Sequence, residues 1–127
     1  MNVVDSSAWL EYFMDGPNAA FFAPAIEAAP ALLVPSVCLF EVLKRFLSDG
    51  DKLGGLERAS AMHTGRVVDL DERLALQAAE LSVKHSLAMA DSIIYAVACQ
   101  HSAKLWTQDQ DFKDLPGVMF IPAGKRP

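Results

Sequence analysis

The sequence predicts an α/β fold in which a short central parallel sheet of four to five strands lies between two layers of helices. Two observations lead to this prediction. Short runs of consecutive apolar residues recur along the chain, for example at residues 2–5 and 31–34. Longer segments with apolar residues at helical spacing separate these runs. Strands that are apolar on both faces and alternate with helices are typical of a parallel sheet that is covered on both sides.

The predicted strands are short, and most of their residues are β-branched or large and apolar, as buried strands require. They cover residues 2–5, 31–34, 66–70, 104–107 and 118–121. In such sheets, ligand sites form beyond the carboxyl ends of the strands. Residues that directly follow a strand are therefore the first candidates for a site.

Helices are predicted between these strands from capping residues and helix breakers. Ser6 and Ser7 offer caps for the first helix, and Gly16-Pro17 closes it. Asp71 caps a later helix in the same way. The predicted helices cover residues 6–14, 18–29, 36–48, 52–64, 71–86 and 91–101, the last beginning at Asp91 or just before, and residues 108–113 form a loop or helical turn.

Length and composition indicate one domain over residues 1–127, with 52% apolar and 21% charged residues. Such a chain can bury a core without disulfides, and we expect Cys38 and Cys99 to be reduced core residues. We expect a cytoplasmic protein, because no segment resembles a signal peptide and no apolar run approaches the roughly 20 residues of a membrane span. The net charge of −5 does not exclude a nucleic-acid partner, because acids clustered on bound cations would locally reverse the sign.

Four carboxylates stand in apolar surroundings, where an uncompensated charge is costly. Asp5 ends the first predicted strand, and Asp109 follows the strand at residues 104–107. Glu41 interrupts an apolar helical run, and Asp91 precedes another. Acids at strand ends and in buried helices can converge in the fold, and a divalent metal is the usual compensator of several converged carboxylates.

Each acid also has an ordinary explanation, which the sequence leaves open. Asp5 and Asp91 are both suited to cap a helix. Glu41 has an opposite charge one turn further along the helix, at Lys44 or Arg45. Asp109, together with Asp111, could simply cap the turn before Phe112.

Taken together, the acids resemble the PIN-domain nucleases, and in particular the small VapC toxins of toxin–antitoxin pairs. Asp5-Ser6-Ser7 resembles the opening Asp-x-Ser motif of the family, and Glu41 resembles its helix-borne glutamate. Asp91 stands where the family has its third acid. Residues 107–112 match its Thr-x-Asp-x-Asp-Phe ending, the most specific of these motifs. Ala88, Ala90 and Ser92 depart from the common pattern around the third acid.

The resemblance implies a PIN-like fold and a Mg²⁺-dependent endoribonuclease, with Mn²⁺ as a possible substitute. Asp5, Asp91 and Asp109 would be direct or water-mediated metal ligands, and Glu41 a second-sphere ligand or water-orienting base. The remaining candidates lie around the metal or contact the substrate. Ser7 and Thr107 would bond to carboxylates or to a phosphate oxygen, and Asp111 would support the loop rather than the metal. Lys44 and Arg45 would either touch RNA phosphates or form a solvated face of the helix.

The same resemblance implies three partners: an RNA substrate, a cognate antitoxin and a second copy of the chain in a homodimer. Aromatic residues at helical spacing in the first helices either belong to the core or line a groove for a helix of the antitoxin. These residues are Trp9, Phe13, Phe21 and Phe22.

Two other functions compete with the nuclease. A non-catalytic module that binds RNA or a partner could use the same fold, and only an activity assay separates it from the enzyme. A phosphotransfer or receiver-type domain also carries acids at the ends of parallel strands. It is disfavoured because Asp5-Ser6-Ser7 supplies no adjacent pair of acids.

Overall fold

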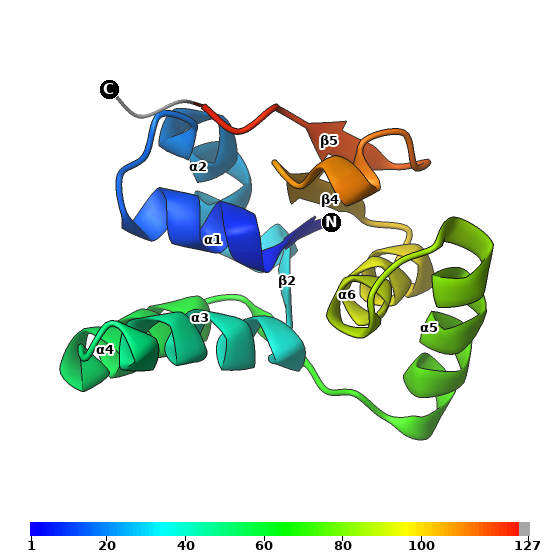
Figure 1. The fold of residues 1–127 in the computed structure, drawn as a ribbon, viewed down its shortest axis with the longest axis horizontal. Coiled ribbons are helices and arrows are strands. Elements are labelled where there is room, and N and C mark those ends of the chain that lie inside the picture. Colours follow the sequence, from blue (N-terminus) through cyan, green and yellow to red (C-terminus); the bar gives the residue numbers. More distant parts are fainter. Residues whose placement is uncertain (125–127) are drawn as a thin grey trace.

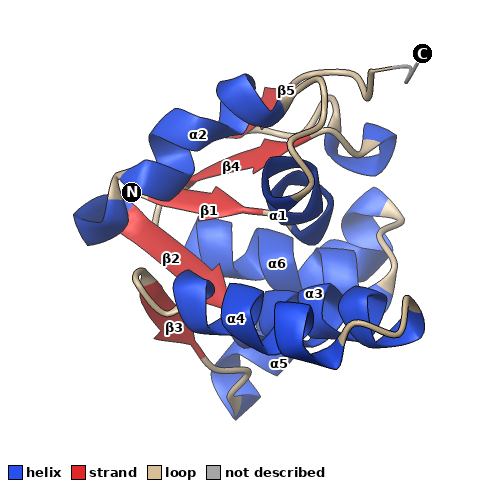
Figure 2. Ribbon diagram, turned by 90° about the vertical axis from the view of Figure 1, so that its left-hand side faces the viewer, coloured by secondary structure: helices blue, strands red, loops and turns tan. Residues whose placement is uncertain are grey.

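The computed structural model describes residues 1–124, which form a parallel sheet with helices on both faces. Within these residues the sheet has five strands in the order β3-β2-β1-β4-β5. The strands are β1 (Asn2–Val4), β2 (Leu32–Pro35), β3 (Arg66–Val68), β4 (Lys104–Thr107) and β5 (Val118–Phe120). Figure 2 shows them fanning out across the molecule, as is expected of a twisted sheet.

Strand β1 lies at the centre of the sheet, where the winding of the chain reverses. Val3 is in register with Leu33 of β2 on one side and with Leu105 of β4 on the other. The chain first moves outward from β1 to β2 and β3, and then crosses back to β4 and β5. The carboxyl ends of β1 and β4 therefore lie at the topological switch point, where α/β sheets bind ligands.

Six α-helices of the described residues cover the two faces of the sheet. They are α1 (Ser6–Phe13), α2 (Ala19–Glu27), α3 (Ser36–Ser48), α4 (Lys52–Met62), α5 (Glu72–His85) and α6 (Met89–Gln100). The chain crosses the sheet in opposite directions before and after β3, and α2 packs against β1 on one face while α6 packs against β1, β2 and β4 on the other (Figure 2). Figure 1 shows α3 with α4, and α5 with α6, as two packed pairs. This arrangement is the predicted three-layer α/β/α fold.

The core lies between the sheet and its helices. Strand residues such as Val4 and Leu105 are fully buried, and so are Ala96 and Val97 of α6. Every residue from Ser92 to Ala98 is buried, because α6 is enclosed by the sheet, α3 and α5. A helix that is apolar all round is expected in such a position. None of the helices within residues 1–124 is long and apolar enough to cross a membrane.

The sequence predicted the type and order of these elements, and the differences are local. Asp5, not Ser6 or Ser7, is the N-cap of α1. The predicted helix over residues 18–29 ends at Glu27 and is followed by a short 3₁₀ turn, η1 (Ala29–Ala31). The prediction for Cys38 is confirmed, since it is free and buried, whereas the prediction for Cys99 is wrong because this residue is exposed on α6.

Candidate active site

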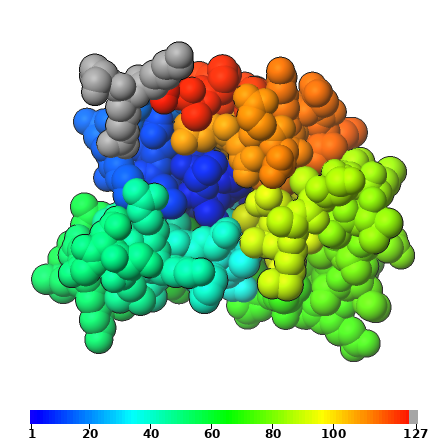
Figure 3. Space-filling view, viewed as in Figure 1, coloured from blue at the N-terminus to red at the C-terminus, as the bar shows by residue number. Residues whose placement is uncertain are grey.

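The carboxyl edge of the sheet brings the four predicted acids to one face of the molecule. Asp5 follows β1, and Asp109 follows β4. Glu41 comes from α3, and Asp91 lies in the first turn of α6. Figure 3 shows this face, where the blue, cyan, yellow and orange segments of the chain meet. The charges of Asp109, Asp5 and Glu41 each act on Asp91, so the four groups share one electrostatic environment.

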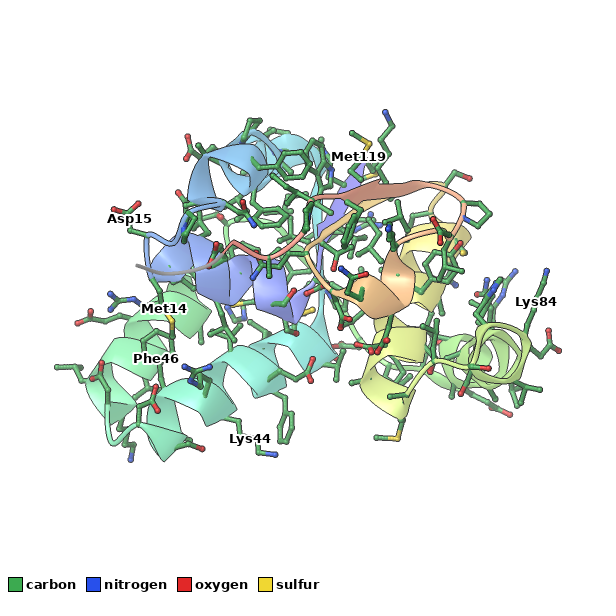
Figure 4. All side chains as sticks on the ribbon, turned by 45° about the horizontal axis from the view of Figure 1, so that its top comes forward. Met14, Asp15, Lys44, Phe46, Lys84 and Met119 are labelled. Atoms are coloured by element: carbon green, nitrogen blue, oxygen red, sulfur yellow. The ribbon has the colours of Figure 1, made fainter. Side chains whose placement is uncertain are left out.

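The tightest group of acids consists of Asp91, Asp109 and Asp111. Each contributes a carboxylate oxygen, and these oxygens lie within 4.8 Å of one another. In Figure 4, side-chain oxygens gather between α3 and the yellow start of α6. Asp111, expected from the sequence to support the loop rather than the metal, has its carboxylate beside the other two. The only sequence feature that hints at this position is the spacing of two residues between Asp109 and Asp111. The 3₁₀ turn η2 (Gln110–Phe112) brings both side chains to the same side of the loop.

Asp5 is buried and serves two purposes at once. One of its oxygens caps α1 by accepting hydrogen bonds from the backbone amides of Ser7, at 2.5 Å, and Ala8, at 3.4 Å. The other accepts a hydrogen bond from the Thr107 hydroxyl. Burial raises the pKa of Asp5 to about 6, although these hydrogen bonds, that of Thr107 foremost, oppose the rise. The ordinary role as a helix cap therefore does not exclude a role in the site.

The loop after β4 is held by a chain of hydrogen bonds that begins at Thr107. Its hydroxyl, besides donating to Asp5, accepts the backbone N–H of Asp109 at 2.9 Å. The Asp109 carboxylate in turn accepts the backbone N–H of Asp111 at 2.9 Å. Thr107 is fully buried, so the first residue of this series of hydrogen bonds is held in place by its surroundings. The loop thereby holds both of its acids toward Asp91.

Asp91 carries the clearest sign of an uncompensated charge. Its pKa is raised to about 7, first by burial and then by the charges of Asp109, Asp5, Glu41 and Asp111. A cation among these groups would remove the repulsion. The donor atoms are all carboxylate oxygens, which are the ligands that Mg²⁺, Mn²⁺ and Ca²⁺ prefer. The site is therefore suited to a hard divalent cation.

Two neighbouring serines have different partners. Ser6 donates from its hydroxyl to Glu41 at 2.6 Å, which joins α1 to α3. The sequence around Ser6 indicates only a helix cap, because nothing local points to a partner 35 residues away. The Ser7 hydroxyl oxygen is buried and has no hydrogen-bond partner within residues 1–124.

The two cations that follow Glu41 do not neutralise it. Arg45 pairs with Asp49, with 3.2 Å between Nε and the carboxylate, on the exposed side of α3. The Lys44 ammonium lies 5.7 Å from the centre of the Phe40 ring. In Figure 4, Lys44 projects from the outer side of α3, away from the gathered oxygens. Within the described residues Glu41 has no salt bridge, so the predicted alternative of an ordinary ion pair is not observed.

The aromatic residues of the first helices divide between core and surface. Trp9 and Phe22 are at most 1% exposed and belong to the core. Trp9 stacks on Phe13, with ring centres 5.4 Å apart, and cannot contact a partner directly. The groove prediction is therefore wrong for Trp9 and Phe22. Phe13 is partly exposed and lines a surface pocket with Tyr12, Ala19, Ala23 and Arg58.

Comparisons with known proteins place the chain in a family. The family model described as the PIN domain matches residues 3–118. No curated protein matches the chain.

Solved structures with the same fold come from several bacteria. A toxin–antitoxin complex from Klebsiella pneumoniae is 22% identical, with a TM-score of 0.76 and coverage of 94% of this chain and 96% of that one. VapC20 from Mycobacterium tuberculosis, described as a sarcin–ricin loop cleaving toxin, is 20% identical, with a TM-score of 0.76 and coverage of 93% and 97%. FitAcB from Neisseria gonorrhoeae is 24% identical, with a TM-score of 0.73 and coverage of 96% and 98%. Since the family model spans nearly the whole chain, the protein belongs to the PIN-domain family.

Proposed function

We propose that this protein is a Mg²⁺-dependent endoribonuclease of the VapC toxin type that a cognate antitoxin inhibits. The observation that carries the proposal is the group of carboxylate oxygens from Asp91, Asp109 and Asp111 within 4.8 Å of one another. These oxygens lie beside Asp5 and Glu41 at the switch point of the sheet. Membership of the PIN-domain family supports nuclease activity. The similarity to a toxin that cleaves the sarcin–ricin loop supports RNA as the substrate.

Asp5, Asp91 and Asp109 would hold the cation, directly or through water, and Asp111 offers a further oxygen. When bound, Mg²⁺ would lower the pKa of a coordinated water and offset charge on the phosphate of the scissile bond. Thr107 fixes the orientation of the Asp5 carboxylate by its hydrogen bond. The carboxylates alone repel one another, so they are prepared for a cation and not for a bare phosphate.

Glu41 would orient the attacking water or accept its proton. Its carboxylate is partly exposed, and the hydrogen bond from Ser6 holds it in position. Lys44 stays a candidate for contact with a phosphate away from the scissile bond, since it is exposed one turn beyond Glu41. Arg45 is less available for this role because it pairs with Asp49.

An antitoxin would occupy the same acidic site. Toxin–antitoxin complexes among the structural relatives support such a partner. An arginine of the partner could pair with two carboxylate oxygens at once and so exclude the metal. We also propose a homodimer and a cytoplasmic location, as the resemblance to VapC toxins implies.

RNA cleavage by the purified protein tests this proposal. We expect cleavage of a structured RNA with Mg²⁺ or Mn²⁺, and none with EDTA. Asp91→Asn should abolish cleavage while the protein stays folded. The matched control is Asp69→Asn, because Asp69 is an exposed carboxylate that follows β3. If the folded wild-type protein binds RNA but never cleaves it with either metal, the non-catalytic module is the correct function. Cleavage that persists in Asp91→Asn would contradict the assigned site.

A further inference from the structure

A partly buried set of polar contacts joins the start of α2 to the acidic loop and belongs to no catalytic motif. Asn18 stands at the N-cap of α2, where an asparagine side chain normally bonds to the first turn of the helix. Here the side chain makes no capping bond. Its amide nitrogen donates instead to the side-chain oxygen of Gln108 at 3.0 Å and to the backbone oxygen of Pro122 at 2.9 Å. Both amide hydrogens of Asn18 therefore serve contacts with distant parts of the chain.

Asn18 is itself held in place by Glu11 of α1. The Glu11 carboxylate accepts the backbone N–H of Asn18 at 2.9 Å. Asn18 is 9% exposed and Glu11 is 8% exposed, so water does not readily replace these bonds. The carboxylate packs directly over Gly16, where any side chain would collide with it. The turn between α1 and α2 thus presents the Asn18 amide in one orientation.

Gln108 connects these contacts to the site, because it lies between Thr107 and Asp109. On one side of the loop, the Thr107 hydroxyl accepts the backbone N–H of Asp109 at 2.9 Å. The backbone oxygen of Thr107 accepts the N–H of Ile121 at 3.1 Å. The bond from Asn18 to Gln108 attaches the loop to α2. Metal ligands need to be positioned within about 0.5 Å, so this attachment bears on the affinity for a cation.

We propose that Asn18 is a positioning residue that acts through Gln108 to hold Asp109 and Asp111 in place for the metal. The proposal rests on the function proposed above. Asn18 touches neither metal nor substrate, and its effect reaches the site through one side-chain hydrogen bond. Loss of that bond lowers the affinity for the cation, and a higher concentration of the cation restores occupancy.

Mn²⁺ binding measured by titration calorimetry on the metal-free protein tests the proposal. The variants are Asn18→Ala, Gln108→Met and the double variant. Gln108→Met keeps the length of the side chain and removes its amide group, including the oxygen that accepts from Asn18. We expect each single variant to bind Mn²⁺ on the order of tenfold more weakly, the lower end of the effect of outer-sphere partners. The double variant should bind no more weakly than Asn18→Ala, since that variant already lacks the bond that Gln108→Met removes.

Tyr12→Phe is the matched control. It removes the hydrogen bond of 3.0 Å from the Tyr12 hydroxyl to Glu27, which joins α1 to α2 without touching the loop. We expect its Mn²⁺ affinity to equal that of the wild type. Melting temperatures in EDTA show whether a variant has lost affinity only because it has lost stability.

The possible failures are distinguishable. If the wild type binds Mn²⁺ and both single variants bind it equally well, the positioning role is wrong and the metal site stands. Additive losses in the double variant would also overturn the role, because they would mean independent effects. If the wild type binds no Mn²⁺, the proposed function fails as well. Should Asn18→Ala not fold, Gln108→Met alone decides the outcome.

Discussion

Replacing Asp91 by asparagine should stabilise the metal-free protein, although a substitution at a half-buried position of a helix usually costs stability. Burial and the neighbouring acids raise the pKa of Asp91 from 3.8 to about 7. A carboxyl whose pKa is higher in the folded protein than in the unfolded chain destabilises the fold as the pH rises from the lower pKa to the higher one. The reason is that the unfolded chain loses its proton first. Asparagine keeps the shape and removes the charge, so the penalty disappears.

The size of the effect follows from the same pKa values. A tenfold change in a proton equilibrium corresponds to about 1.4 kcal/mol, so the rise from 3.8 to about 7 would cost about 4 kcal/mol without screening. Asp91 is partly exposed, and water screens its neighbours, so we expect about half of this, ~2 kcal/mol. For a chain of 127 residues this corresponds to a rise in melting temperature of roughly 6 to 8 °C.

Thermal melts in EDTA at about pH 5 and about pH 7.5 measure the effect. The gain of Asp91→Asn over the wild type should be larger at the higher pH, where Asp91 is ionised in the folded protein. Asp69→Asn, on the exposed surface, should change little at either pH. If Asp91→Asn is neutral or destabilising at both pH values, the acids do not repel one another as the structure indicates.

Three further predictions concern other residues of the site and the cysteines. Mn²⁺ at 100 times its dissociation constant should raise the unfolding free energy of the wild type by about 2.7 kcal/mol. In thermal melts, Asp5→Asn should lose most of the stabilisation that Mn²⁺ gives the wild type. Thr107→Val removes the hydroxyl that donates to Asp5, so chemical denaturation should show a loss of about 1–3 kcal/mol near pH 7.5. The loss should be smaller near pH 5, where Asp5, with its pKa of about 6, is protonated. An equal loss at both pH values would mean that the bond to the ionised Asp5 carboxylate adds no stability, and that the loss comes from the bond to the Asp109 N–H or from packing. A thiol reagent should modify the exposed Cys99 rapidly and the buried Cys38 only on unfolding, and two equally fast reactions would contradict the burial of Cys38.

The fold could be predicted because its signals are local. Residues 32–34 are apolar on both faces, and the structure buries all three in β2. The run from Ser92 to Ala98 has no polar face, and it forms the helix that contacts three strands. Asp5 and Asp109 follow strands in the sequence, so their common edge followed from the rule for parallel sheets.

The rest depended on contacts between distant residues. Trp9 and Phe13 lie four residues apart on α1 and look equivalent in the sequence, but Trp9 is fully buried in the core whereas Phe13 packs at its edge and stays partly exposed. Ser6 bonds to a residue of another helix, and no local pattern indicates this. Asn18 looks like a helix cap, and its side chain turns to the far end of the chain. The place of Asp111 depended on a three-residue 3₁₀ turn, whose geometry the spacing alone does not determine.

The carboxylates of Asp5, Asp91 and Asp109 are proposed to share a divalent cation. Anomalous X-ray scattering from crystals of the protein grown with Mn²⁺ tests this proposal most directly, since the signal locates the ion independently of any activity. We predict an anomalous peak within coordination distance, about 2.0–2.4 Å, of oxygens from Asp91 and Asp109. The same data should show a water near Glu41 on the side of the ion. A well-ordered acidic site without an anomalous peak at saturating Mn²⁺ would contradict the account.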